Sequence, residues 1–155
     1  MTNHRKWPIW LTSVCLAIIT TAPICAHSAE AGRAEDEATI KTVLARFYEG
    51  WNAHNVDKMV SVYAEDVDHI NVYAKWSQGK VAIREAIRSF HSGRGRNDHK
   101  TYTIEKIRFL KPDVAVIHVR SLSTVGNIGT YVMTKATGEW LVVTFTNVEY
   151  ALPSA

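Results

Sequence analysis

Apolar and polar residues follow two different periods along this chain. Beyond residue 30, the first half repeats apolar residues every three or four positions over segments 35–51, 56–63 and 77–91. That spacing predicts three amphipathic helices, and Asn55 is a suitable N-cap for the second. Between the last two helices we expect a strand at about residues 67–73.

The second half alternates between apolar and polar residues and therefore predicts strands. The alternating segments are KTYTIEKIRFL (100–110), VAVIHVRSLSTV (114–125), IGTYVMTK (128–135) and EWLVVTFTNVEY (139–150). "KPD", "GN" at 126–127 and "ATG" separate them and predict tight turns. Helices followed by an antiparallel meander predict one α+β domain, with the helices on one face of the sheet.

The first thirty residues have the layout of a secretory signal peptide. Arg5 and Lys6 precede the uncharged stretch WPIWLTSVCLAIITTAPIC, and small residues follow it. Cleavage is expected after Ser28 or Ala31, which leaves a single domain over 31–155, periplasmic or secreted and free of the membrane. A retained membrane anchor is the alternative, because the apolar run approaches the length that spans a bilayer.

Cysteine content and charge exclude several kinds of function. Cys15 and Cys25 both lie in the leader, so the exported domain would have no disulfide, thiolate nucleophile or cysteine metal ligand. Without Arg5 and Lys6, the 18 basic residues fall to 16 against 15 acidic ones, a formal charge near +1. This balance gives no support for a nucleic-acid partner.

The stretch DVDHINV, residues 66–72, places residue types that bind metals or transfer protons beside the predicted strand. Because side chains alternate along a strand, Asp68 and His69 face opposite sides and cannot bind one metal together. Asp66 and Asp68 are interpreted as polar residues of the strand end. His69 and the nearby Asn71 are candidates for a site.

A second polar stretch, SGRGRNDHK at 92–100, joins the third helix to the next strand. Its glycines and basic residues are typical of a solvated connection. A loop that binds an anion is the alternative interpretation.

Three longer stretches carry a family resemblance. "FYEGWNAHNVDKMVSVYAEDVDHINV", "GKVAIREAI" and "IRFLKPDVAVIHV" together resemble the SnoaL-like members of the nuclear transport factor 2-like superfamily, and most closely the subgroup labelled SgcJ/EcaC. The likeness covers about residues 36–150. It implies a curved antiparallel sheet wrapped around three helices as a cone, with a pocket at the wide end and a homodimer formed through the sheet.

The ketosteroid isomerases share that fold, and alignment with them tests their mechanism on this chain. Through the shared "YA-acid-Asp" and "G-x-x-x-I" marks, their catalytic aspartate falls on Asn71 and their oxyanion-hole tyrosine falls on Phe47. An amide accepts no proton at neutral pH, and a phenyl ring has no hydroxyl to donate. The resemblance therefore disfavours a steroid-isomerase mechanism.

The same alignment implies which side chains face the pocket. If position 71 faces inward, His69 and Tyr73 do too, and two later strands turn alternate polar residues to the same interior. Helical aromatic residues are expected to form apolar walls, and Trp76 the rim. The candidate ligand-binding residues are Phe47, Trp51, Asn71, Tyr73, Trp76, Phe90, Arg120, Phe145 and Asn147, and the candidate catalytic residues are His118 and His69.

Each assignment has a purely structural alternative. The helical aromatic residues would simply pack the core, and Asn71 and Asn147 would be buried amides that hold loops in place. His118 would be a core histidine. Elsewhere, His54 is expected to brace the turn between two helices, and His91 to place a cation at a helix C-terminus.

Three classes of function are compatible with these residues. The first is an exported protein that binds a small, partly apolar molecule bearing a carboxylate, enolate or carbonyl oxygen. The second is an isomerase, lyase or cyclase that acts beside a carbonyl, with His118 or His69 as base and Arg120 or Asn147 stabilising the oxyanion. The third is a dimeric association module.

No cofactor is expected for any of the three. The chain has no G-x-G-x-x-G between a strand and a helix. His69 and His118 without clear acidic company would be a weak metal-binding set, so no metal site is expected either.

Overall fold

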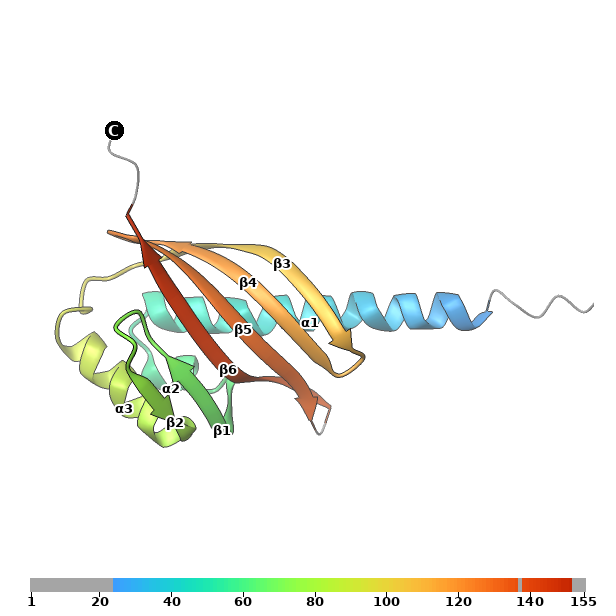
Figure 1. The fold of residues 1–155 in the computed structure, drawn as a ribbon, viewed down its shortest axis with the longest axis horizontal. Coiled ribbons are helices and arrows are strands. Elements are labelled where there is room, and N and C mark those ends of the chain that lie inside the picture. Colours follow the sequence, from blue (N-terminus) through green and yellow to red (C-terminus); the bar gives the residue numbers. More distant parts are fainter. Residues whose placement is uncertain (1–23, 137, 152–155) are drawn as a thin grey trace, which may run out of the picture.

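The computed structural model describes residues 24–136 and 138–151 of the 155-residue chain. Three helices and six strands follow one another along this part of the chain (Figure 1). They are α1 (Ile24–Asn52), α2 (Val56–Val60), β1 (Tyr63–Ile70), β2 (Trp76–Gln78), α3 (Gly79–Ser92), β3 (Thr101–Lys111), β4 (Val114–Leu122), β5 (Gly126–Ala136) and β6 (Glu139–Tyr150). Most of the predicted signal peptide, residues 1–23, lies outside the described residues. Within them, no helix is both long and apolar enough to cross a bilayer.

The six strands form one curved sheet in the order β2-β1-β6-β5-β4-β3, and α1 runs across its concave face (Figure 1). The predicted α+β fold is confirmed. All neighbouring strands are antiparallel except β1 and β6, which pair in parallel. This parallel pair was not predicted, and it brings His69 beside Phe145, its Cα partner in β6.

The strand boundaries differ from the prediction where a side chain turns the backbone. β1 runs from Tyr63 to Ile70. It ends there because Asn71 Oδ1 accepts hydrogen bonds from the backbone N–H of Tyr73 at 2.9 Å and of Lys75 at 3.1 Å. These two bonds close a turn that leads into the short strand β2. β2 was not predicted, and it occupies the residues at which the third helix was expected to begin.

The prediction of a turn at "GN" 126–127 is wrong. The turn lies at residues 123–125, where Ser123 N–H donates to the Val125 carbonyl at 3.1 Å. The strand β5 already begins at Gly126. Gly126 lies beneath the Tyr150 ring, and a Cβ there would come within 2.3 Å of it. The glycine is therefore required by a close ring contact rather than by the turn.

The core lies between the sheet and one face of α1, with part of α3. Each large apolar side chain that is fully buried in this core contributes about 1.5–3 kcal/mol to the stability of the fold by leaving water. Trp140, 2% exposed, also donates its indole N–H to Asp36 Oδ1 at 2.9 Å and so ties β6 to α1. The largest fully buried side chains are Trp140, Tyr63, Tyr131, Ile40, Leu44, Met59, Ile83, Ile117, Met133, Val60, Val62 and Val67.

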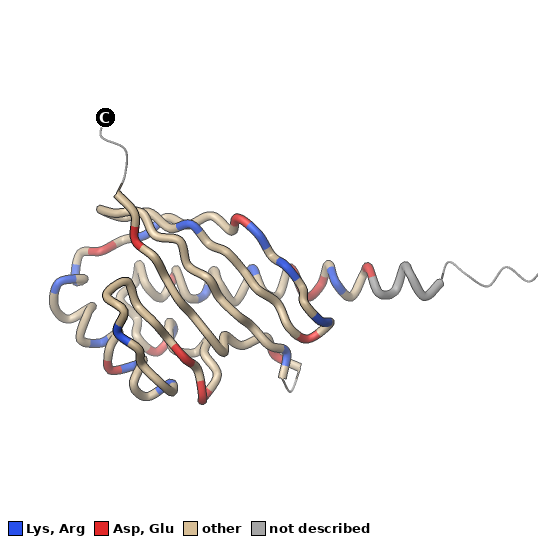
Figure 2. Tube along the Cα trace, viewed as in Figure 1, with Lys and Arg blue, Asp and Glu red and all other residues tan. Residues whose placement is uncertain are grey.

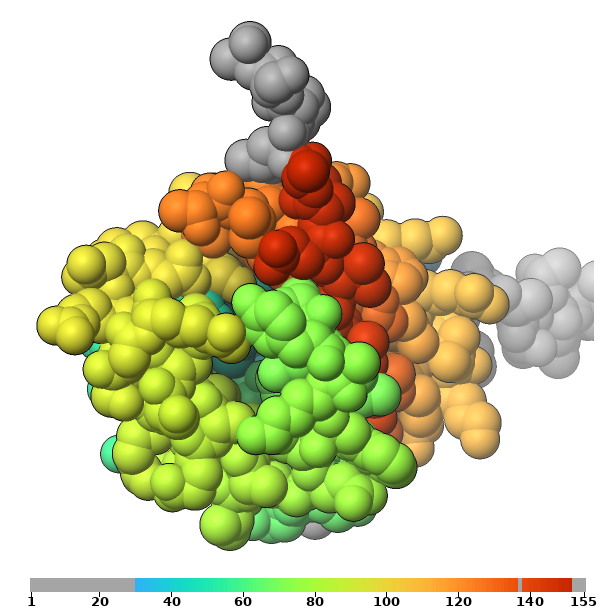
Figure 3. Space-filling view, turned by 60° about the vertical axis from the view of Figure 1, so that its left-hand side comes forward, coloured from blue at the N-terminus to red at the C-terminus, as the bar shows by residue number. Residues whose placement is uncertain are grey.

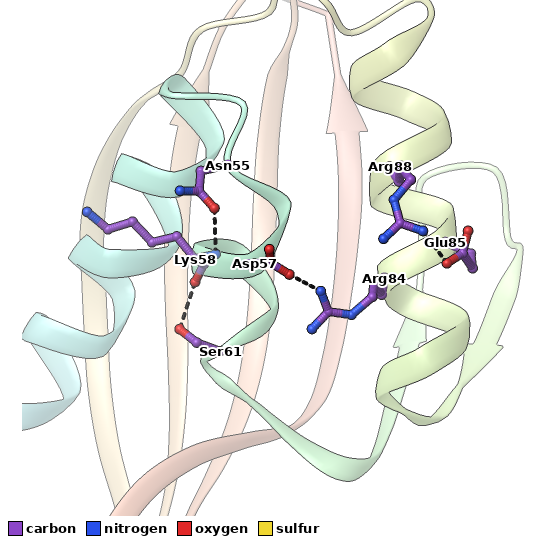
Figure 4. Close-up of polar contacts among 7 residues, drawn as sticks. All are labelled: Asn55, Asp57, Lys58, Ser61, Arg84, Glu85 and Arg88. Carbon is purple, nitrogen blue, oxygen red and sulfur yellow. Dashed lines mark hydrogen bonds and ion pairs between the residues drawn. The ribbon is translucent and has the colours of Figure 1, made fainter.

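The corner between α2 and α3 is held by polar contacts on the surface (Figure 4). Asn55 Oδ1 accepts from the Lys58 backbone N–H at 2.9 Å, which confirms Asn55 as the N-cap of α2. An ion pair between Asp57 and Arg84 joins α2 to α3. The ion pair links the two helices at the surface, and α3 forms one wall of the cavity described next.

Candidate functional site

A cavity of about 450 Å³ opens at the end of the sheet where α3 approaches the β1–β2 turn. Figure 3 shows the hollow between the yellow α3 and loop region and the green β1–β2 region, with the teal surface of α1 at its bottom. A volume of this size is typical of sites for small organic molecules.

Aromatic rings from both helices and strands line the cavity. The Phe145 ring stacks on Tyr131, with centroids 4.2 Å apart and planes at 22°, and on His69, at 4.9 Å and 24°. Gly129 leaves the space that this stack needs, because a Cβ there would lie 2.8 Å from the Phe145 ring. The aromatic lining residues are Phe47, Tyr48, Trp51, Tyr63, His69, Tyr73, Phe90, Tyr131 and Phe145.

His69 is held in its neutral form. Burial lowers its pKa from 6.5 to about 4, because the imidazolium would lose its hydration between these rings. His69 lines the cavity, and neither of its ring nitrogens forms a hydrogen bond with another described residue. A neutral imidazole offers one N–H donor and one lone pair to a bound molecule.

The tyrosines of the inner wall also stay uncharged. The hydroxyls of Tyr48 and Tyr131 form a buried hydrogen bond of 3.2 Å. Burial raises the pKa values of Tyr48, Tyr63 and Tyr131 above the ordinary value of 10. The inner cavity is therefore uncharged near neutral pH.

Of the four asparagines that line the cavity, Asn71 and Asn147 use their amides in different ways. Asn71 uses its Oδ1 to hold the β1–β2 turn, so this amide has the loop-holding role that was one of the predicted alternatives. Asn147 donates through Nδ2 to Asn127 Oδ1 at 3.4 Å. The buried Asn147 Oδ1 has no hydrogen-bond partner among the described residues.

A histidine pair lies behind Trp51. His54 Nδ1 and His91 Nδ1 are 2.7 Å apart, and the left-handed backbone of His54, at φ 52°, positions this contact. His54 thus braces the end of α1. Burial, together with the neighbouring His54, lowers the pKa of His91 to about 4. The predicted cation at this helix end is therefore wrong, because a buried imidazole loses its proton.

The prediction that His118 and Arg120 face the cavity is wrong. In β4 the buried side chains are Ala115, Ile117, Val119 and Ser121, so the alternate residues face outward. On the outer face, Arg120 donates from Nε to Glu105 Oε1 at 2.6 Å and from a terminal nitrogen to the Tyr150 hydroxyl at 3.0 Å. His118 Nδ1 lies 3.2 Å from Thr130 Oγ1.

The prediction for Trp76 is also wrong. This side chain is 59% exposed and donates its indole N–H to Asp68 Oδ1 at 2.8 Å, outside the cavity. Asp68 thus faces away from His69, as the strand alternation implied. Because His69 and His118 lie on opposite faces of the sheet, they cannot share a metal. Across 24–136 and 138–151, no group of three or more His, Cys, Asp or Glu could hold a metal ion.

The other predicted site residues do surround the cavity: Phe47, Trp51, His69, Asn71, Tyr73, Phe90, Phe145 and Asn147. Sequence reasoning missed Tyr48 and Tyr131. It named the loop of Arg94 and Lys100 only as an alternative anion-binding segment and did not connect it with the pocket. Strand alternation in β5, where Asn127, Gly129 and Tyr131 share a face, was the signal for Tyr131. The orientation of β4 could also have been predicted, because burying the face that carries the charged Arg120 would be costly.

Comparison with known families agrees with this fold. The model of the SnoaL-like domain matches residues 44–149. This chain belongs to the SnoaL-like domain family. No curated protein matches the sequence.

Solved structures with the same fold are distant in sequence. A cystatin-like domain of unknown function from Nostoc punctiforme has a TM-score of 0.71 at 16% identity, covering 76% of this chain and 79% of that one. A ketosteroid isomerase-like protein from Erwinia carotovora has a TM-score of 0.65 at 13% identity, with 74% and 96% covered. A hexachlorocyclohexane dehydrochlorinase has a TM-score of 0.66 at 13% identity, with 81% and 93% covered. At this identity the likeness concerns the fold alone.

Proposed function

We propose that this protein is an exported receptor for a small, partly apolar molecule, which it binds in the cavity without transforming it. The observation that carries the proposal is the cavity of about 450 Å³, whose inner wall is a continuous set of rings held in uncharged forms. Such a wall favours an apolar ring system by burial and by stacking. We also propose that the chain belongs to the SgcJ/EcaC subgroup, on the stretches that resemble it.

Binding is favoured over catalysis by the protonation of the inner residues. A general base works best with a pKa near the operating pH, whereas burial lowers the pKa of His69 to about 4. The buried tyrosines have raised pKa values and are correspondingly weak acids. The position that aligns with the isomerase aspartate is Asn71, whose Oδ1 is committed to the backbone turn.

The enzymatic alternative is a cofactor-independent isomerase, lyase or cyclase. It is favoured by the cavity-facing His69 and by the names of two neighbours of the same fold, the isomerase-like protein and the dehydrochlorinase. In that case His69 would act as the base once a bound substrate supplied a polar partner. Turnover that disappears in a His69→Gln variant would favour this alternative.

The test of the receptor proposal is the recovery of a bound molecule. The mature protein is purified from its native host, and small molecules released on denaturation are identified by mass spectrometry. Ala86 lines the cavity from α3, so Ala86→Phe should fill it and abolish the recovery. Ala82→Phe is the matched control, because Ala82 is exposed on the same helix.

Recovery of the same compound from the wild type and from Ala82→Phe, but not from Ala86→Phe, would support the receptor. The proposal is wrong if nothing is recovered and no compound of a broad metabolite screen raises the unfolding temperature, since a ligand that binds the folded state must stabilise it.

A further inference from the structure

Two cationic side chains line the cavity, and both come from the loop between α3 and β3. They are Arg94 and Lys100. The Arg94 guanidinium lies 4.7 Å from the centroid of the Tyr73 ring and 5.3 Å from that of Phe90. The Lys100 ammonium lies 4.1 Å from the centroid of a Trp51 ring. Neither charged group has a hydrogen bond or an ion pair to another described residue.

Lys100 is held in this position by its backbone. Its N–H donates to Asn52 Oδ1 at 2.7 Å, and its carbonyl accepts from Asn52 Nδ2 at 2.9 Å, which fastens the loop to the end of α1. Burial lowers the pKa of Lys100. A partly desolvated ammonium without a hydrogen-bond acceptor is costly, and the face of Trp51 recovers only part of that cost.

The two carboxylates that line the same cavity do not neutralise these cations directly. Asp98 Oδ2 accepts the Trp51 indole N–H at 3.1 Å, and the Glu149 side chain is exposed. Both attract Lys100 at longer range, but no ion pair forms. Some other basic residues form ion pairs on the surface, such as Lys80 with Glu65 at 2.9 Å, whereas others, such as Lys106, are exposed and form none with a described residue. The unpaired cations are thus placed where a bound molecule would meet them.

We propose, on the basis of the receptor function above, that the ligand is an aromatic ring system that carries an anionic oxygen group such as a carboxylate or sulfonate. The rings lie against the uncharged inner wall, and the anionic group lies at the mouth against Lys100. Arg94 leaves the Tyr73 ring and donates a second charge-assisted bond. The loop SGRGRNDHK therefore supplies the anion contacts, in place of the outward-facing Arg120.

A pair of fluorescent probes that differ in one group tests this inference. 8-Anilinonaphthalene-1-sulfonate carries a sulfonate, and N-phenyl-1-naphthylamine is the same ring system without it. We expect the sulfonate probe to bind the mature protein more than tenfold more tightly than the neutral one, because each charge-assisted hydrogen bond is worth about tenfold. Added salt should weaken only the sulfonate probe, because the cations lie at the cavity mouth.

Substitutions assign the effect to the loop. Lys100→Met keeps an unbranched side chain over Trp51 and removes the charge, so it should weaken the sulfonate probe about tenfold and leave the neutral probe unchanged. Arg94→Gln should act in the same direction, and it tests the charge at an exposed position that the fold does not need. Lys106→Met, at an exposed lysine of β3, is the matched control and should change neither probe.

The outcomes separate the two proposals. If both probes bind equally and Ala86→Phe blocks both, the cavity is a receptor but the anionic ligand class is wrong. If Lys100→Met and Arg94→Gln both leave the sulfonate probe unaffected, the inference is wrong even when that probe binds better. If neither probe binds the folded wild type, this inference fails, and the receptor proposal is decided by the recovery of a bound molecule.

Discussion

His69 should make the stability of the fold depend on pH, and His69→Gln should remove that dependence. Burial lowers the pKa of this histidine from 6.5 to about 4. The folded state therefore disfavours the imidazolium. The contribution of His69 to stability is present in full above the unfolded pKa of 6.5 and is lost as the pH falls from 6.5 toward about 4.

The size of the effect follows from the two pKa values. At about 1.4 kcal/mol per pH unit, the difference corresponds to a ceiling of roughly 3 kcal/mol. Near pH 5, about 2 kcal/mol of this would be lost. Because the ring keeps some contact with water in the open cavity, we expect a loss of about 1–2 kcal/mol at that pH.

Urea unfolding near pH 7.5 and near pH 5 measures this loss in the wild type and in His69→Gln. Since many carboxylates and other histidines also respond to pH, the informative quantity is how much the pH-dependent loss differs between the two proteins. His118→Gln is the matched control, because it removes a histidine from the outer face of the sheet. The reasoning is refuted if His69→Gln loses as much stability as the wild type over this range.

Three further predictions concern the scaffold and the assembly. Asp36→Leu should destabilise the fold by about 1–3 kcal/mol in urea unfolding, because the buried Trp140 indole N–H loses its acceptor. Asp36→Asn keeps an acceptor and should destabilise the fold less. Equal losses of stability in the two variants would contradict this prediction. Asn55→Ala should cost about 1 kcal/mol by removing the cap of α2, and no change in the urea midpoint would contradict it. We propose a homodimer through the outer face of β4 to β6, whose middle lacks charged residues (Figure 2). Light scattering should then give twice the chain mass for the wild type and the chain mass for Val132→Lys, and a monomeric wild type would refute the dimer.

Apart from β2, the order of helices and strands could be predicted because it depends on local patterns. The apolar spacing of α1 and α3 matches helical geometry, and the alternation of β3 to β6 matches the pleat. The turns were less predictable, because their positions depend on specific contacts. Asn71 ends β1 by binding two backbone N–H groups, and Gly126 lies in a strand because the Tyr150 ring covers it.

The candidate site was predictable only in strands for which the inward-facing side could be identified from the sequence. In β1 and β6 the residues expected to face inward, His69, Phe145 and Asn147, do border the cavity. In β4 both faces are rich in apolar residues, and the likeness to the family led to the wrong one. His118 and Arg120 therefore lie outside.

The amino-acid sequence by itself determined the helix and strand periods and the family. Period and composition are properties of neighbouring residues, so they can be read from the chain directly. Only the tertiary structure decided that the parallel pairing of β1 with β6 stacks His69 on Phe145, and that a loop places Arg94 and Lys100 over rings of other elements. These contacts join residues far apart in the chain. The burial that results from them determines which side chains are charged near neutral pH.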